Sequence, residues 1–318
     1  MTTTFFKYIF IVSVATWVML SCTKQTTPEA FDLQPPKVGT PEYYLNLEAY
    51  KKSDHGIAFG WFGGWTAQGP SKSKYLASTP DSMDIISIWG GWSNLTPEQI
   101  ADMRYVQQKK KTRITFTVIA HQIGDGINGD RKFWPADDST AIVTYARAIV
   151  DTVNKYGYDG FDIDYEPDFC GCAVFLKNNN MRIFVKELGK YLGPKSGTGK
   201  LLLCDGGYYG PVTNRSMPLE LLEYINYWME QAYGANNTGL ATRLAAFPKG
   251  FPSKKFVVNE NFESLWQGGG NLLTMASWNP AGGRKGGIGT YHMEYEYPNE
   301  PDYKFMRRAI QIMNPAPY

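Results

Sequence analysis

Three carboxylates at alternate positions of one short segment are the groups in this chain best suited to chemistry. Asp162, Asp164 and Glu166 are separated by Phe161, Ile163 and Tyr165. Because successive side chains of a β-strand point to opposite faces, this pattern predicts a strand with one apolar and one acidic face. Three carboxylates at this spacing cannot all ionise without cost in a confined site, and such perturbed pKa values are typical of acid–base catalysis. We therefore predict an acid–base site at the C-terminal end of this strand.

A solvated strand, with or without a bound metal ion, is the alternative interpretation. A calcium-binding loop also spaces acidic residues by two, but it needs a flexible loop with Gly at its sixth position. Here apolar residues separate the carboxylates, and Gly160 precedes them. Zinc is not expected either, because none of the three His has ligand spacing with the cysteines. We expect no metal and no cofactor.

The acidic strand belongs to a regular alternation of strands and helices. Most of the strand-like runs are near-continuous apolar segments, as in parallel strands that are buried on both faces. They are residues 57–62, 84–89, 113–120, 160–165, 201–205, 227–232, 255–259 and 287–293. Helical patterns lie between most of them, one opening on the capping box Thr96-Pro97-Glu98-Gln99. The alternation predicts a single (β/α)8 TIM barrel over residues 46–318, with the acidic strand as the fourth of eight.

The first residues resemble a bacterial lipoprotein signal peptide. Lys7 precedes an apolar run over residues 8–20, which ends at Leu20-Ser21-Cys22. We expect residues 1–21 to be removed, Cys22 to be lipidated, and the polar, Pro-rich segment 22–45 to be a tether. An ordinary secretory signal with an incidental cysteine is the alternative. The interpretation predicts an exported lipoprotein of the outer membrane, on the cell surface or the periplasmic face.

Charge and cysteine content limit the partners. The net charge is +2, and no basic cluster exceeds the three lysines at 109–111, which excludes a nucleic-acid footprint. We expect a monomer. Cys170, Cys172 and Cys204 remain after processing, an odd number in an exported protein. A bridge from Cys204 to one of the other two and free buried thiols both stay open.

Residues 159–166 resemble the DGxDxDxE signature of glycoside hydrolase family 18 and match it at every fixed position. The family contains chitinases and endo-β-N-acetylglucosaminidases, and its signature lies on the fourth strand of a barrel. The resemblance covers most of residues 57–313, and it is closest to compact Bacteroidetes lipoproteins of the endo-β-N-acetylglucosaminidase branch.

The resemblance implies a retaining, substrate-assisted mechanism, in which the 2-acetamido oxygen of the sugar attacks its own anomeric carbon to form an oxazolinium ion. Glu166 would protonate the leaving oxygen and later deprotonate water. Asp164 would bind the acetamide N–H. Asp162 would share a proton with Asp164, a purely structural role being the alternative.

The resemblance also implies residues that bind the sugar. Tyr233 takes the place of a tyrosine that contacts the acetamide carbonyl. Chitinases typically have Asp soon after the Met at this position, in a Met-x-Tyr-Asp arrangement. After Met229 this chain instead reads Gln231-Ala232-Tyr233, which is closer to the endo-β-N-acetylglucosaminidase branch. Gln231 is then a ligand for the acetamide or a hydroxyl, with a buried amide bonded to backbone as the alternative. Tyr291 takes the place of an aromatic floor that is usually Trp.

Further candidates for sugar contact lie near other strand ends. They are Asn259 and Glu260 at the seventh strand, Trp61 and Trp65 at the first, and Trp89 and Trp92 at the second. For each tryptophan, packing in the core is the alternative to stacking on sugar.

These expectations lead to one predicted function and two alternatives. We predict an endo-β-N-acetylglucosaminidase that cuts the GlcNAc-β-1,4-GlcNAc core of N-linked glycans and leaves one GlcNAc on the protein. A chitinase is the first alternative, but residues 261–286 are too few for the subdomain that chitinases often insert there. A catalytically inactive glycan-binding lipoprotein is the second, and the presence of Glu166 argues against it.

Overall fold

The computed structural model describes residues 37–120, 124, 127, 139–166, 174–176, 179–207 and 219–315. The chain divides into two compact units, Met1–Tyr43 and Tyr44–Tyr318. The predicted signal peptide, Cys22 and the first part of the predicted tether lie outside the described residues. The last part of that predicted tether is helical, because α2 begins at Pro41.

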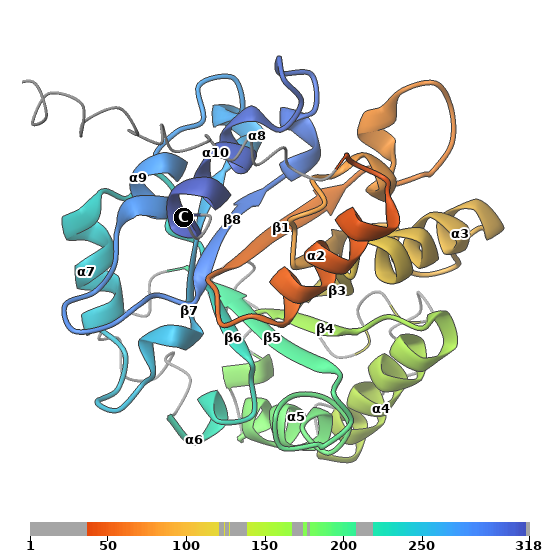
Figure 1. Ribbon diagram of the computed structural model, residues 1–318. Helices are drawn as coiled ribbons and strands as arrows, with labels where there is room; N and C mark the ends of the chain where they lie inside the picture. Colours follow the sequence, from red (N-terminus) through yellow and green to blue (C-terminus); the bar gives the residue numbers. More distant parts are fainter. Residues whose placement is uncertain are drawn as a thin grey trace, which may run out of the picture. The chain divides into compact units, whose positions relative to one another are not determined.

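Eight parallel strands close into a barrel in chain order, with β1 paired to both β2 and β8 (Figure 1). The strands are β1 (Ile57–Gly63), β2 (Ile85–Trp89), β3 (Arg113–Ile119), β4 (Gly160–Asp164), β5 (Leu201–Gly206), β6 (Tyr227–Glu230), β7 (Phe256–Asn261) and β8 (Gly287–Tyr291). The predicted (β/α)8 barrel is confirmed, and each predicted strand end lies within two residues of the observed one. The acidic strand is β4, the fourth of eight.

Helices follow most strands and cover the outside of the barrel (Figure 1). They are α2 (Pro41–Lys52), α3 (Pro97–Tyr105), α4 (Ser139–Tyr156), α5 (Asn180–Leu188), α6 (Leu219–Leu222), α7 (Asn237–Ala245), α8 (Phe262–Leu265), α9 (Leu272–Ser277) and α10 (Lys304–Met313). The predicted capping box is present at α3, where Thr96 and Gln99 bond each other's backbone N–H. Among the described helices, none is long and apolar enough to cross a bilayer.

Alternate strand residues divide between two hydrophobic clusters. Phe161 and Ile163 of β4 lie in the larger cluster, which also contains the buried faces of the helices. The smaller cluster lies inside the barrel and includes Phe59, Leu203 and Met229. Asp162 and Asp164 alternate with the outward pair, so they point into the barrel. The predicted two-faced strand is therefore confirmed, with its apolar face under the helices and its acidic face inward.

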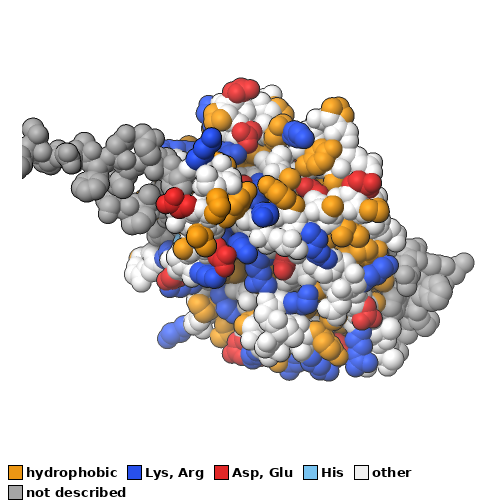
Figure 2. Space-filling model, turned by 45° about the vertical axis from the view of Figure 1, so that its right-hand side comes forward, with side chains coloured by type: hydrophobic (Ala, Val, Ile, Leu, Met, Phe, Trp, Pro, Cys, Tyr) orange, Lys and Arg blue, Asp and Glu red, His pale blue; other side chains and the backbone are white. Residues whose placement is uncertain are grey.

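The outer surface is mixed in character. On the face drawn in Figure 2, basic, acidic and hydrophobic side chains are interspersed, and no large field of one charge is visible. Inside the barrel, the character of the side chains changes along the barrel axis. It changes from apolar side chains such as Phe59 and Leu203 to carboxylates and aromatic rings toward the C-terminal strand ends.

Candidate active site

Asp162 is a fully buried carboxylate inside the barrel. Its Oδ2 accepts hydrogen bonds from Trp61 Nε1 at 2.9 Å and from Thr117 Oγ1 at 2.9 Å. Ser87 bonds the Thr117 hydroxyl at 2.6 Å and so orients it. Burial raises the pKa of Asp162 to about 6, and the hydrogen bonds from Thr117 and Trp61 work in the opposite direction. The group therefore gains or loses its proton within the range in which enzymes operate.

Asp164 and Asp205 form a buried pair next to Asp162. They are register partners on β4 and β5, and they are 4% and 1% exposed. Burial and the charges of Glu166 and Asp162 raise the pKa of Asp164. Burial and the charges of Asp164 and Asp162 raise the pKa of Asp205. At least one proton must stay in this group near neutral pH, because neighbouring buried carboxylates cannot all ionise.

The proton-sharing expected between Asp162 and Asp164 stays a prediction, and Asp205 is a third candidate for it, because it lies within hydrogen-bonding reach of both. In each of the three carboxyls, one oxygen has no donor among the described residues: Asp162 Oδ1, Asp164 Oδ1 and Asp205 Oδ2. A proton on Asp205 Oδ2 would let that oxygen donate to one of the other two. Sequence reasoning missed Asp205. Its signal was an acidic residue at the end of the strand that follows the acidic one.

Glu166 lies two residues beyond β4, at the mouth of the barrel, and is partly exposed. Gln231, just beyond β6, donates from one nitrogen to Glu166 Oε1 at 2.7 Å and to Asp205 Oδ1 at 2.9 Å. The alternative of an amide side chain bonded to backbone is therefore wrong. The amide instead joins the partly exposed glutamate to the buried pair, which places Glu166 above a proton-holding cluster.

Aromatic rings surround this mouth. The centroid of Tyr291 lies 6.3 Å from Trp61, 6.1 Å from Trp89 and 6.2 Å from Tyr233. Burial and the charges of Asp205, Asp164 and Glu166 raise the pKa of Tyr233, so its phenol stays a neutral hydrogen-bond donor. Burial, with Glu263 and Glu294 nearby, raises the pKa of Tyr291 to about 12. The structure thus brings Tyr233 and Tyr291 to the acidic cluster.

Two residues predicted to reach sugar hydroxyls do not face the mouth. Asn259 is fully buried, and its amide nitrogen donates to the carbonyl oxygens of Glu230 and Val257. Its Oδ1 lies against Gly289, where an added Cβ would be 2.2 Å away. The carboxylate of Glu260 accepts from the backbone N–H groups of Gly234, Asn261 and Asn271, so it holds loops together. The Glu260 carboxylate is thus taken by backbone groups, and Asn259 Oδ1, although it has no donor among the described residues, is fully buried.

The four tryptophans near β1 and β2 divide into two kinds. Trp65 donates to Asp102 and Trp92 stacks on Phe116, so both belong to the outer packing. Trp61 is on β1 rather than after it, is 2% exposed and donates to Asp162. The prediction that Trp61 lines a subsite is corrected on this ground: it acts through Asp162. Trp89 is partly exposed beside Tyr291 and is the one of the four that can meet a sugar face.

A pocket of about 420 Å³ adjoins this aromatic group at the ends of β1 and β8. Trp266, His292, Glu294 and Tyr295 are among its lining residues. His292 lies 4.3 Å from the ring of Tyr291 and stacks on Tyr295 at 4.6 Å, and Glu294 bonds its Nδ1 at 2.6 Å. Ring faces beside hydrogen-bonding groups are the usual lining of a site for a polar ligand with apolar faces.

Among the described residues, no group of three or more His, Cys, Asp or Glu side chains is arranged to hold a metal ion. Cys204 is a free and fully buried thiol on the outward face of β5. Cys170 and Cys172 lie outside the described residues.

Comparison with known proteins identifies the family. Residues 24–312 match Glycoside hydrolase family 18, BT1044-like. The chain belongs to glycoside hydrolase family 18. It is 28% identical to endo-β-N-acetylglucosaminidase F2 of Elizabethkingia meningoseptica, over 99% of this chain and all of that protein. As a family 18 member, the chain is a glycoside hydrolase.

Two solved structures are similar to the barrel over most of their length. A BT1044 variant is 30% identical with a TM-score of 0.75, over 87% of this chain and 94% of that one. The apo endo-β-N-acetylglucosaminidase from Cordyceps militaris is 26% identical with a TM-score of 0.71, over 88% of this chain and 98% of that one.

Proposed function

We propose that this family 18 hydrolase is an endo-β-N-acetylglucosaminidase that cleaves the GlcNAc-β-1,4-GlcNAc core of N-linked glycans. The observation that carries the proposal is the bond of Gln231 to Glu166 above the buried Asp164–Asp205 pair. In this arrangement Glu166 is a partly exposed acid, and Asp164, two residues before it, is a buried carboxyl. The full-length similarity to endo-β-N-acetylglucosaminidase F2 supports the substrate class.

The arrangement supports a retaining, substrate-assisted mechanism. Glu166 gives its proton to the leaving glycosidic oxygen while the acetamide oxygen of the same GlcNAc attacks the anomeric carbon. Asp164 accepts the acetamide N–H and balances the positive charge of the oxazolinium ion. Glu166 then takes a proton from water, the oxygen of which opens that ring with retention of configuration. Deep burial suits Asp164 for hydrogen bonding and charge balance rather than for direct attack.

Tyr233 has a defined part in this scheme. Its neutral phenol lies close to Asp205, Asp164 and Glu166, whose charges raise its pKa. It would donate to the acetamide and hold the attacking oxygen toward the anomeric carbon. The ring of Tyr291, with Trp89 beside it, would support the sugar face.

Pocket dimensions and the loop after β7 favour an N-glycan over chitin. The pocket lined by Trp266 and Tyr295 gives room for sugars beyond the reacting GlcNAc. The segment between β7 and β8 contains only the short helices α8 and α9, with no room for the subdomain often inserted there in chitinases.

The test is mass spectrometry of a native N-glycoprotein incubated with the full-length protein and with Glu166→Gln. The unmodified enzyme should leave a single GlcNAc on each Asn and release the rest of the glycan. Loss of the general acid should slow turnover about a thousandfold without changing the melting temperature. Glu223→Gln, at an exposed surface pair with Lys195, is the matched control and should stay active. Full activity of Glu166→Gln would refute the assignment.

We further propose that the enzyme is an exported, monomeric lipoprotein, anchored to the outer membrane through Cys22. The sequence Leu20-Ser21-Cys22 after an apolar run supports this anchoring. Labelling of cells with a palmitate analogue should mark the protein, and Cys22→Ser should abolish the label. Equal labelling of both forms would overturn the proposal.

A further inference from the structure

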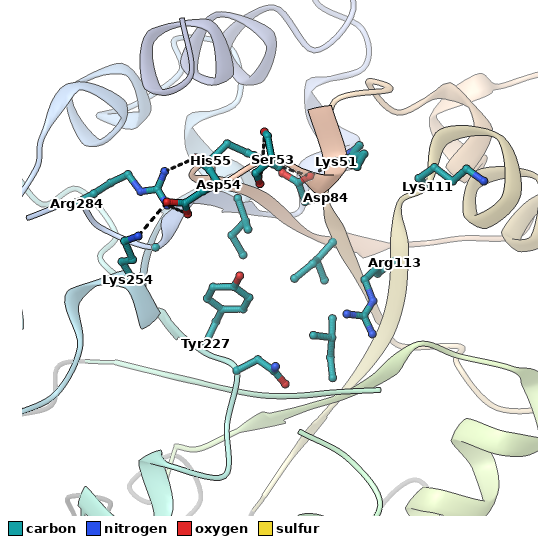
Figure 3. A pocket seen from close by; sticks show the side chains of 15 residues that line it. Lys51, Ser53, Asp54, His55, Asp84, Lys111, Arg113, Tyr227, Lys254 and Arg284 are labelled. Carbon is teal, nitrogen blue, oxygen red and sulfur yellow. Dashed lines mark hydrogen bonds and ion pairs between the residues drawn. The ribbon is translucent and has the colours of Figure 1, made fainter. Parts of the chain in front are cut away.

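A second cavity lies at the opposite end of the barrel from Glu166 (Figure 3). It has a volume of about 340 Å³. The first residues of five strands line it: Ile57, Ile85, Arg113, Leu201 and Tyr227. Because all eight strands are parallel, their first residues lie at the end of the barrel remote from the site described above. This N-terminal cavity is therefore distinct from the glycosidase site.

The N-terminal cavity carries a surplus of positive charge. Its cationic lining residues are Lys51, Lys111, Arg113, Lys254 and Arg284, and its carboxylates are Asp54 and Asp84. With His55 neutral, these groups leave three positive charges. A concave site with one dominant sign of charge concentrates ligands of the opposite sign.

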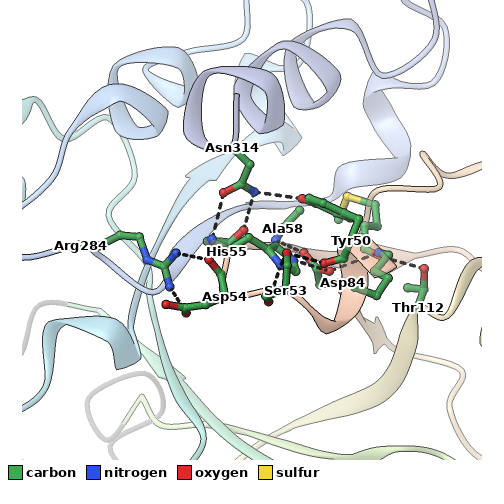
Figure 4. Close-up of polar contacts among 12 residues, drawn as sticks. Tyr50, Ser53, Asp54, His55, Ala58, Asp84, Thr112, Arg284 and Asn314 are labelled. Carbon is green, nitrogen blue, oxygen red and sulfur yellow. Dashed lines mark hydrogen bonds and ion pairs between the residues drawn. The ribbon is translucent and has the colours of Figure 1, made fainter. Parts of the chain in front are cut away.

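The carboxylates of Asp54 and Asp84 form ion pairs and hydrogen bonds with cationic side chains and His55 on one side of the cavity. Asp54 accepts from Lys254 at 3.0 Å and from Arg284 at 2.6 Å. Asp84 accepts from His55 at 3.1 Å and pairs with Lys51 at 3.3 Å (Figure 4). These pairs hold the rim in place. On the opposite wall the charge of Asp159 acts on Arg113, and Glu48 lies 3.6 Å from Lys111.

Asn314 fixes the loop that carries this rim. Its side chain accepts from Gly56 N at 2.9 Å and donates to Gly56 O at 2.8 Å, and it also bonds the Tyr50 hydroxyl (Figure 4). The segment with Asp54 and His55 is therefore held on both sides, by Asn314 and by the ion pairs. A wall that is already fixed loses little conformational entropy when a ligand binds.

Arg113 and Tyr227 point their polar groups into the N-terminal cavity (Figure 3). The guanidinium of Arg113 uses Nη2 to donate to the carbonyl oxygens of Asp159 and Gly199. Its Nε and Nη1 have no hydrogen-bond acceptor among the described residues, nor has the Tyr227 hydroxyl. Lys111 contributes a further charge, and its contact with Glu48 is a loose one at 3.6 Å. Arg113 and Tyr227 thus present donors to the cavity that bond no acceptor among the described residues.

We propose that this cavity binds a phosphate- or sulfate-type oxyanion, held by Arg113 and Tyr227, with Lys111 adding positive charge at the rim. A tetrahedral oxyanion offers several acceptor oxygens, which match the planar fork of an arginine and the point charge of a lysine. The volume accommodates the oxyanion together with a small organic group. Free inorganic or sugar-linked oxyanions and phospholipid headgroups share this chemistry. The site goes beyond the glycosidase function and does not depend on it.

The first experiment is calorimetric titration of the full chain with sodium phosphate and with sodium sulfate at constant ionic strength. One saturable site is expected for at least one of the two anions. Arg113→Gln should weaken binding about tenfold or more, as loss of a charge-assisted bond predicts. Tyr227→Phe should weaken it about threefold with unchanged folding and glycan hydrolysis, because the hydroxyl has no protein partner. Lys109→Gln is the matched control for Lys111→Gln, since Lys109 lies over the Tyr44 ring outside the cavity.

Vesicles distinguish the source of the anion. Phosphatidylglycerol vesicles are mixed with the full chain carrying Cys22→Ser, so that a lipid anchor cannot contribute. Sedimentation that phosphate suppresses and Tyr227→Phe reduces would assign a lipid headgroup. Phosphate or sulfate binding without sedimentation would assign a soluble oxyanion. Absence of saturable binding to phosphate, sulfate and vesicles would overturn the proposal. So would affinities of Arg113→Gln, Lys111→Gln and Tyr227→Phe that all equal that of the unmodified chain.

Discussion

Gln231 Nε2 lies 2.7 Å from Glu166 Oε1, so a neutral amide holds the proposed catalytic acid. The same nitrogen lies 2.9 Å from Asp205 Oδ1. A carboxylate in the place of this amide would add a fifth carboxyl group to Asp162, Asp164, Asp205 and Glu166, and a lysine would favour ionisation of the whole cluster. An amide positions Glu166 without doing either.

Gln231→Met should lower kcat about tenfold while KM changes little. The substitution keeps the length of the side chain but removes the donor that orients Glu166, and misplacement of a catalytic group costs mainly kcat. Loss of the bond to Asp205 also removes an interaction that lowers the pKa of that carboxyl. Steady-state kinetics between pH 4 and pH 8 are the measurement. Gln68→Met, at an exposed glutamine, is the control, and a kcat equal in both variants would contradict a positioning role.

Asp162→Asn should stabilise the protein at pH 7.5 and have little effect near pH 4. The pKa of Asp162 is raised from about 3.9 in an unfolded chain to about 6, so the folded state binds the proton more tightly. Its stabilising contribution is complete below about pH 4 and is lost as the pH rises through about 6. Two pKa units correspond to about 3 kcal/mol, the order of the gain expected at pH 7.5.

Urea unfolding of both forms at the two pH values tests this prediction. Asn offers one oxygen to Trp61 and Thr117, as Asp162 does now, so those hydrogen bonds should survive. A variant less stable than the unmodified protein at pH 7.5 would show that Asp162 is ionised in the folded state without cost.

Local pattern in the sequence predicted much of the fold and the centre of the site. The apolar runs located all eight strands because parallel strands are buried on both faces. The alternation in β4 placed Asp162 and Asp164 on the inward face because side-chain direction in a strand depends only on position. Tyr233, Gln231 and Tyr291 came from family resemblance and meet around the mouth of the barrel.

Other features depend on register and side-chain direction across strands, which sequence alone does not contain. Asp205 joins the cluster because β5 pairs with β4 so that it lies beside Asp164. Asn259 stays inside the barrel because Gly289, its neighbour on β8, leaves room for its amide. Glu260 is turned to the backbone N–H groups of its neighbour Asn261 and of Gly234 and Asn271 in two separate loops. A position at the end of a strand therefore predicted that a residue lies near the mouth. It did not predict which groups the side chain contacts.

Tyr233→Phe should lower kcat about tenfold to a hundredfold on an N-glycan substrate. The variant loses the phenol that would orient the acetamide, while the ring and its contact with Tyr291 remain. A preformed GlcNAc oxazoline substrate enters after the acetamide attack, so its hydrolysis should suffer much less. Rates on both substrates are compared, with Tyr191→Phe at the exposed surface as the control. Equal loss on the glycan and on the oxazoline would argue that Tyr233 acts on a later step.

Tyr295→Ala should impair long substrates and spare short ones. The ring is 41% exposed and stacks on His292 at 4.6 Å, in the pocket that adjoins Tyr291. If sugars beyond the reacting GlcNAc occupy this pocket, loss of the ring should raise KM for a complete N-glycan about tenfold, as one stacking contact is worth. A trimmed core that cannot reach the pocket should keep its kcat/KM. Tyr191→Ala is the matched exposed control. An equal loss of kcat/KM on the trimmed core and on the complete glycan would contradict a glycan contact. It would indicate that Tyr295 supports Tyr291 through His292.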